Sequence, residues 1–175
     1  PENSLFGAIC RTGGISIDKG KLRILGSAPA NIDGLYSIID FNDPQNSKQH
    51  SFIVFAYDYL GNYYAVNIDP DSGFKVGEIV ALFIDGNTWE STSDNILEFM
   101  EYCMLGDIWG IFQEFLVPPE IEGLSTGDLR KVISFYPPLY SREGSIAKSS
   151  LRVVSAREEL SLRSSLSLLI SSVDS

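Results

Sequence analysis

The chain has 175 residues, a formal net charge of −10 and 44% hydrophobic residues, among them ten Phe and eight Tyr. This length and apolar content predict one domain with a filled core, and they exclude a disordered chain despite the charge. No apolar run approaches the roughly 20 residues that span a bilayer, and no signal peptide opens the sequence. We therefore expect no membrane contact, and the use of the two cysteines described below is consistent with a cytoplasmic protein. Because the first residue is Pro1 rather than Met, we also expect a trimmed N-terminus.

The charge is concentrated between residues 51 and 129, where fourteen carboxylates accompany a single base, Lys75. The 50 residues before this block are neutral, and the 46 residues after it carry a net charge of +3. So strong a field of one sign predicts a basic partner surface. It argues against nucleic acid as a partner, because phosphates would be repelled.

Glycines divide the first 30 residues into short segments, which predicts short strands between turns, with residues 21–25 the clearest strand. Residues 35–41 are predicted to form another strand, which Asp43-Pro44 ends.

A β-hairpin is the strongest local prediction. Residues 52–57 are a continuous apolar run, Asp58 to Asn62 form a turn in which Gly61 or Asn62 can take a positive φ, and residues 63–68 run back. A second turn and a strand over residues 77–85 follow, so the three strands predict an antiparallel meander.

The hydrophobic period then becomes helical. Ser93 or Asp94 is the predicted N-cap of a helix that reaches Val117, with a break near Gly106, and Pro118-Pro119 ends it. Residues 131–136 are predicted to form a late strand.

The C-terminal segment begins with a capping-box pattern, Ser155 and Glu158, which favours a helix for residues 160–170. The alternation of Ser and Leu there also suits a strand.

A search for reactive groups yields little. The single histidine, His50, lies in a polar segment, and the distant cysteines Cys10 and Cys103 are predicted to be reduced packing residues. Asn67, Asp69, Asp71 and Glu78 fit four positions of a calcium loop. However, Ser72 stands where the loop needs glycine, so a strand turn is the better interpretation. We expect no enzyme, and no catalytic residue, cofactor or metal ion.

Four segments resemble a known family in their order along the chain. They are Gly13-Gly14-Ile15-Ser16 with its following Gly and Arg, the strand ending in Asp58-Tyr59-Leu60-Gly61, the segment from Trp89 to Met100, and Tyr136-Pro137-Pro138-Leu139-Tyr140. Together they resemble the SMI1/KNR4-like (SUKH) immunity-protein superfamily, especially its relatives in type VI secretion.

This resemblance covers roughly Gly13 to Ser155 and implies an α+β domain, a curved antiparallel meander flanked by helices, which we assign to residues 1–155. Residues 156–175, outside the resemblance, are expected to form a C-terminal helix or tail. It also implies a cytoplasmic antidote that binds a cognate secreted toxin, and it transfers no catalytic residue. The alternative is an adaptor or scaffold module that binds a basic protein or peptide.

The predicted contact region for a basic toxin is the junction between the last meander strand and the first helix. Acids would steer the partner and aromatics would anchor it. Solvated acids, and core packing for Trp89, are the simpler interpretations. The seven predicted partner-binding residues are Asp85, Trp89, Glu90, Asp94, Glu98, Glu101 and Tyr102. For Asp58, we expect a capping role in its own hairpin.

Overall fold

The computed structural model describes residues 11, 13–27, 35–42, 51–105 and 119–173, and within the last range it describes the side chains of residues 121–164. Cys10, His50 and the helical segment predicted between Gly106 and Val117 lie outside the described residues.

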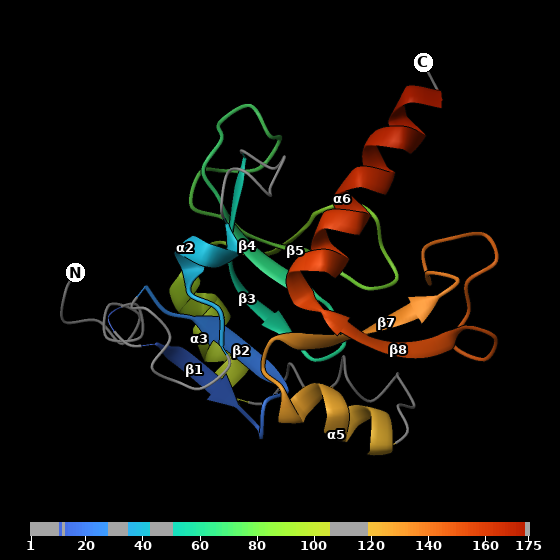
Figure 1. Ribbon diagram of the computed structural model, residues 1–175. Helices are drawn as coiled ribbons and strands as arrows, with labels where there is room; N and C mark the ends of the chain where they lie inside the picture. The colour runs from blue at the N-terminus through green and yellow to red at the C-terminus, as the bar shows by residue number, and fades with distance from the viewer. Residues whose placement is uncertain (1–10, 12, 28–34, 43–50, 106–118, 174–175) are drawn as a thin grey trace.

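The main element is a six-stranded antiparallel sheet in which each strand pairs with its neighbours in sequence (Figure 1). Its strands are β1 (Gly14–Ile17), β2 (Leu22–Leu25), β3 (Phe52–Asp58), β4 (Tyr63–Asn67), β5 (Ile79–Leu82) and β6 (Glu90–Ser93). A separate antiparallel pair consists of β7 (Lys131–Tyr136) and β8 (Ser150–Ser155). The predicted α+β class and antiparallel meander are confirmed, and the sheet is open rather than closed into a barrel.

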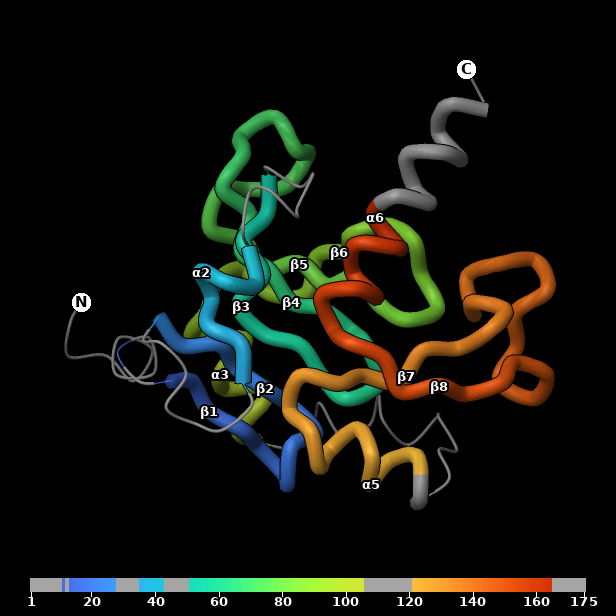
Figure 2. Tube along the Cα trace, viewed as in Figure 1, coloured from blue at the N-terminus to red at the C-terminus, as the bar shows by residue number. Residues whose placement is uncertain are grey.

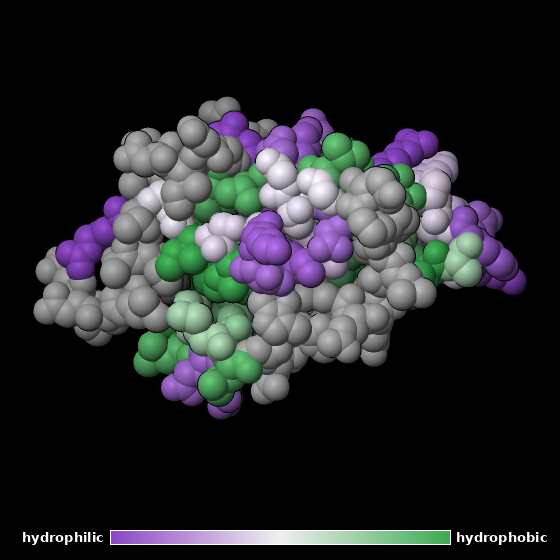
Figure 3. Space-filling model, turned by 90° about the horizontal axis from the view of Figure 1, so that it is seen from below, coloured by the Kyte–Doolittle hydropathy of each residue, from purple (hydrophilic) through white to green (hydrophobic). Residues whose placement is uncertain are grey.

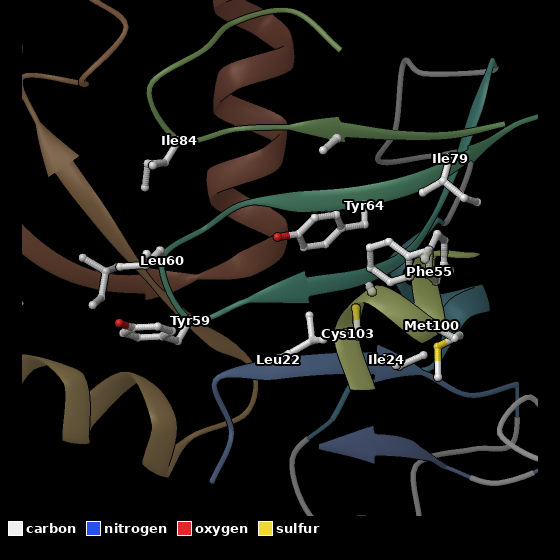
Figure 4. Close-up of a cluster of buried hydrophobic side chains, with 14 of the residues drawn as sticks. Leu22, Ile24, Phe55, Tyr59, Leu60, Tyr64, Ile79, Ile84, Met100 and Cys103 are labelled. Carbon is white, nitrogen blue, oxygen red and sulfur yellow. The ribbon is translucent and has the colours of Figure 1, made fainter. Parts of the chain in front are cut away.

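Helices cover both sides of this sheet. The described helices are α2 (Ile38–Phe41), α3 (Ile96–Leu105), α5 (Pro119–Gly127) and α6 (Ala156–Val173). Helices α3 and α6 lie on opposite sides of the meander (Figures 1 and 4). The predicted C-terminal helix is therefore confirmed, and it begins directly after Ser155 as the capping pattern indicated.

Strand alternation divides the core into two layers. On β3 and β4, Ala56 and Tyr64 point to the side of α3, whereas Tyr57 and Tyr63 point to the side of α6. We call these layers the α3-side core and the α6-side core. Helix α3 contributes the buried side chains of Phe99, Met100 and Cys103 to the first layer (Figure 4). Helix α6 contributes Ala156 and Leu160 to the second layer.

The turn between β3 and β4 is fixed by a buried carboxylate. Asp58 accepts hydrogen bonds from the backbone N–H groups of Leu60 and Asn62, from the Asn62 amide at 2.7 Å and from the Tyr64 hydroxyl at 3.1 Å. Gly61 has a φ of 91°, and a Cβ there would lie 3.2 Å from the Ile133 carbonyl oxygen. The predicted hairpin and the capping role of Asp58 are confirmed.

Two buried arginines connect distant elements to the meander. Arg163 of α6 donates to the carbonyl oxygens of Gly61 and Gly86, at 3.0 and 2.7 Å, and also to that of Phe83. Arg23 of β2 donates to the carbonyl oxygens of Lys131 at 2.7 Å and Ser125 at 2.8 Å. The guanidinium groups thus hold α6, α5 and β7 against the sheet.

The strand predicted over residues 35–41 is wrong, because residues 38–41 form the short helix α2. Ser37 caps this helix: its hydroxyl oxygen accepts from the Asp40 N–H at 3.0 Å and its hydroxyl donates to the Asp40 carboxylate at 2.7 Å. At the other end, the Asn42 amide donates to the Ile38 carbonyl oxygen. These local side-chain bonds outweigh the apolar pattern that suggested a strand.

Three further elements were not predicted. The first is β6: the sequence analysis ended the meander at residue 85 and expected a direct junction with the first helix, but Glu90–Ser93 form a sixth strand. Helix α5 begins at Pro119, where proline occupies the first helical position. The sequence analysis interpreted Pro118-Pro119 only as the end of the preceding helix. Strand β8 pairs with β7 along all six residues of each strand.

Replacement of Arg163 by Lys should destabilise the fold. One ammonium group cannot reproduce a planar fork that bonds three carbonyl groups, so we expect a loss of about 2–4 kcal/mol in unfolding free energy. Urea denaturation of the full chain measures this loss. Arg152→Lys is the matched control, because Arg152 is exposed and lies over Tyr136 at 5.3 Å. Equal losses in the two variants would contradict a structural role for Arg163.

Candidate functional site

The seven residues predicted to bind a partner lie along β6 and at its two ends. Asp85 stands in the turn that follows β5, Trp89 directly precedes β6, and Glu90 is the first residue of β6. Beyond the strand, Asp94 precedes α3, which carries Glu98, Glu101 and Tyr102. All of these side chains are exposed except that of Trp89, which is half-buried. We call the five exposed carboxylates the acidic edge: they are Asp85, Glu90, Asp94, Glu98 and Glu101.

Strand β6 forms the outer edge of the meander, and β5 is its only partner in the described part of the chain. The strand is short, and its pairing shifts register opposite Ile79 and Val80. Thr92 is the extra residue at this bulge, and its hydroxyl donates to the Ile79 carbonyl oxygen at 3.0 Å. Short length, a bulge and a charged residue protect a sheet edge from added strands. The edge therefore offers side chains, rather than free backbone groups, to a partner.

The turn that carries Asp85 is anchored from inside the protein. Arg163 of α6 donates to the carbonyl oxygens of Phe83 and Gly86, on either side of this turn. The Asn62 side chain accepts the Ile84 N–H at 2.7 Å. Figure 2 shows the segment between β5 and β6 beside α6. Asp85 is thus held outward at a fixed position by buried groups.

Trp89 packs against the sheet. Its ring lies 5.0 Å from that of Phe52, at an interplanar angle of 39°, and it borders the α6-side core. Core packing was the simpler alternative to an anchoring role, and the structure shows that contact. Because α3 covers the opposite side of the sheet, Trp89 and Tyr102 do not belong to one aromatic patch.

The start of α3 is organised by polar side chains. Asn95 is the N-cap, since its side-chain oxygen accepts the N–H groups of Leu97 and Glu98 at 3.0 and 3.1 Å. The N-cap therefore lies one residue after Asp94 and two residues after Ser93, the two positions that were predicted. Glu98 reaches back to accept the N–H of Asp94, the residue before the N-cap, at 2.8 Å.

Lys75, the single base of the acidic block, lies at this end of the edge. Its ammonium group is 3.5 Å from the Asp94 carboxylate, and both side chains are exposed. An exposed ion pair of this kind contributes little and is easily displaced. The acidic edge therefore keeps an excess of negative charge.

The outer side of α3 contains large apolar residues that the sequence analysis did not select. Leu97 is 60% exposed and Leu105 is 79% exposed. With Glu101 between them, they have the i, i+4, i+8 spacing of one helical row, and Glu98 and Tyr102 form the adjacent row. The sequence could have revealed this row, because helical spacing places it opposite the residues of the same helix that were predicted to be buried. We call these five residues the α3 outer face.

The calcium-like frame forms an internally bonded loop. Asp69 accepts the Ser51 hydroxyl at 2.6 Å, and Glu78 accepts the Lys75 N–H at 2.7 Å and the Ser91 hydroxyl at 2.5 Å. In the described segments, no group of three His, Cys, Asp or Glu residues is placed to hold a metal ion.

Cys103 is a buried, free cysteine of the α3-side core. Burial raises the pKa of its thiol to about 12, so the thiolate that would react at neutral pH is scarce. The predicted packing role is confirmed for this cysteine.

Asp58 is a carboxylate with a strongly shifted pKa inside the core. Burial raises its pKa to about 6, although hydrogen bonds from Asn62 and Tyr64 act in the opposite direction. Its side chain is completely buried, and its oxygens are occupied by the donors that fix the β3–β4 turn. These contacts describe a structural carboxylate.

The described residues define an α+β protein with an open six-stranded meander and an acidic edge. The chain belongs to the family described as "Protein of unknown function DUF2625", whose model matches residues 1–159. It is similar to a protein of Haemophilus influenzae that is described as uncharacterized, with 27% identity over 144 residues. That match covers 79% of this chain and 62% of the relative. No solved structure matches the chain.

Membrane insertion finds no support in the helices that the structure describes. None of them combines the length and the apolar character needed to cross a bilayer.

The shifted pKa of Asp58 predicts a pH-dependent stability. The folded pKa of about 6 lies above the ordinary value of 3.8, so the folded state holds this proton more tightly than the unfolded state. The contribution to stability is therefore present below about pH 4 and is lost as the pH rises through about 6. Relative to Asp58→Asn, the wild type should lose about 3 kcal/mol over this range.

Urea denaturation at a series of pH values measures this difference. Tyr64→Phe removes a donor to the Asp58 carboxylate, so it should move the loss to higher pH. A difference between wild type and Asp58→Asn that is independent of pH would contradict the assignment.

Proposed function

We propose that this protein is a non-enzymatic immunity protein of the bacterial cytoplasm, which binds and neutralises a cognate secreted antibacterial toxin. One observation carries the proposal: five exposed carboxylates line the acidic edge, and a single exposed lysine accompanies them. The resemblance to SUKH immunity proteins supports the toxin as the kind of partner, and the bacterial relative supports the setting.

Electrostatics favour a basic partner for this edge. Exposed carboxylates repel one another, and a basic surface relieves that repulsion on binding. Opposite charge also increases the rate of association, most strongly at low salt. A toxin that acts on nucleic acid needs a basic cleft for its substrate, and an acidic protein fits such a cleft.

The edge is suited to recognition because it is held in place. Arg163 and Asn62 fix the turn that carries Asp85, and Asn95 fixes the start of α3. A preformed surface loses less conformational entropy on binding than a flexible one.

The direct experiment is a rescue assay. Bacteria that express the secreted effector encoded beside this gene should stop growing, and co-expression of the full chain should restore growth. A purified pair that binds while the effector stays active would indicate the alternative, an adaptor. A chain that neither binds nor rescues would overturn the proposal.

Charge reversal on the acidic edge should weaken this complex. We expect Glu90→Lys with Glu101→Lys to reduce the association rate roughly tenfold at low salt, and high salt should reduce the wild-type rate in the same direction. Stopped-flow or surface plasmon resonance measurements with the effector provide the rates.

The matched control is Glu143→Lys with Glu158→Lys, which reverses two exposed acids outside the acidic edge. Equal effects of the two double variants would show that only the total charge matters. That result would contradict a role for the edge itself.

A further inference from the structure

The α3 outer face departs from the usual pattern of a surface helix. Such a helix normally buries one apolar stripe and exposes polar residues on the other side. Helix α3 buries Phe99, Met100 and Cys103, yet it also exposes large apolar residues on the opposite side.

This exposure is concentrated on one helix. Four of the eleven exposed large hydrophobic residues in the described chain belong to α3, and they are Leu97, Tyr102, Met104 and Leu105. Among the side chains that the structure describes, α2, α5 and α6 each contribute a single one, at Ile39, Leu124 and Leu162 respectively. In the view from below, hydrophobic side chains lie at the surface next to hydrophilic ones (Figure 3). Apolar side chains gathered on one exposed element mark an interaction surface.

We propose that the α3 outer face docks a basic amphipathic segment of a partner protein, with apolar side chains set against Leu97 and Leu105 and with Lys or Arg beside Glu98 and Glu101. This inference rests on the proposed function and specifies the contact that the toxin would make. Leu97 and Leu105 are eight residues apart, about 12 Å along the helix, so two to three turns of a partner helix would cover the row.

Charge complementarity selects this occupant over the others. A second copy of the chain would place Glu98 and Glu101 against the same carboxylates, which is unfavourable. An anionic membrane surface or nucleic acid would meet the same repulsion. A segment that combines apolar and basic side chains satisfies both components of the face.

The test uses three synthetic helical peptides of equal length with the full chain. The first peptide combines Leu and Lys, the second replaces Leu by Ser and keeps the charge, and the third replaces Lys by Glu. We expect the Leu/Lys peptide to bind at least tenfold more tightly than either of the others, by fluorescence anisotropy. We also expect its largest NMR shift changes to fall on α3.

Three variants decide the location. Leu97→Ser with Leu105→Ser should reduce affinity for the Leu/Lys peptide at least tenfold, whereas Leu124→Ser, at a leucine of α5 that is 62% exposed, should leave it unchanged. Glu101→Lys should weaken binding of the Leu/Lys peptide and strengthen that of the Leu/Glu peptide. Circular dichroism melting confirms that each variant is folded.

The inference is overturned if the Leu/Lys and Ser/Lys peptides bind equally, or if the double serine variant binds the Leu/Lys peptide like the wild type. These outcomes are separate from those of the rescue assay. If the double serine variant rescues growth like the wild type, the α3 outer face is not the toxin contact, and the proposed immunity function still stands. If the Leu/Lys peptide binds on α3 but the wild type rescues nothing, the immunity function is contradicted, and the docking role of the face still stands.

Discussion

The arrangement of this protein depends on buried charged groups at the turn between β3 and β4. Asp58 fixes the turn from within, and the Arg163 guanidinium binds the Gly61 carbonyl oxygen of the same turn. The Tyr59 carbonyl oxygen accepts the Ile133 N–H of β7 at 2.8 Å. Burying a charge is costly unless hydrogen bonds compensate it. Asp58 accepts four such bonds and the two terminal nitrogens of Arg163 donate three, whereas the Arg163 Nε has no partner among the described residues. The meander, β7 and α6 therefore meet at one point with little freedom to shift.

This internal constraint reaches the surface through the same side chains. The guanidinium that binds Gly61 also binds Phe83 and Gly86, so the position of the Asp85 turn follows from the docking of α6. On the other side of the sheet, the packing of Phe99 and Cys103 sets the rotation of α3 and directs Leu97 and Glu101 outward. Thus the surface that we propose for binding is determined by contacts in the core.

The sequence predicts those elements whose signals are local. The hairpin around Asp58, helix α3 and the start of α6 follow from period, turn residues and caps. The error at residues 35–41 is also local, because the bonds between Ser37 and Asp40 compete with an apolar run that resembles a strand.

Long-range contacts could not be predicted in this way. Arg163 and Gly61 are 102 residues apart, and nothing near Arg163 in sequence indicates that it is buried. The same limit applies to the predicted site. Residues 85–101 are continuous in sequence, but β6 separates their acids into two groups, and Trp89 packs on the side of the sheet opposite α3.

The separation of these groups suggests a division of physical roles on the surface. Exposed acids attract a basic partner over a distance, and this attraction mainly sets the rate of association. Apolar contacts act only at close range, and they set how long a complex lasts. Asp85 and Glu90 stand among polar neighbours at one end of β6, whereas Glu101 stands between Leu97 and Leu105. A partner attracted by the whole edge would therefore find its closest fit on α3, where charge and apolar surface occur together.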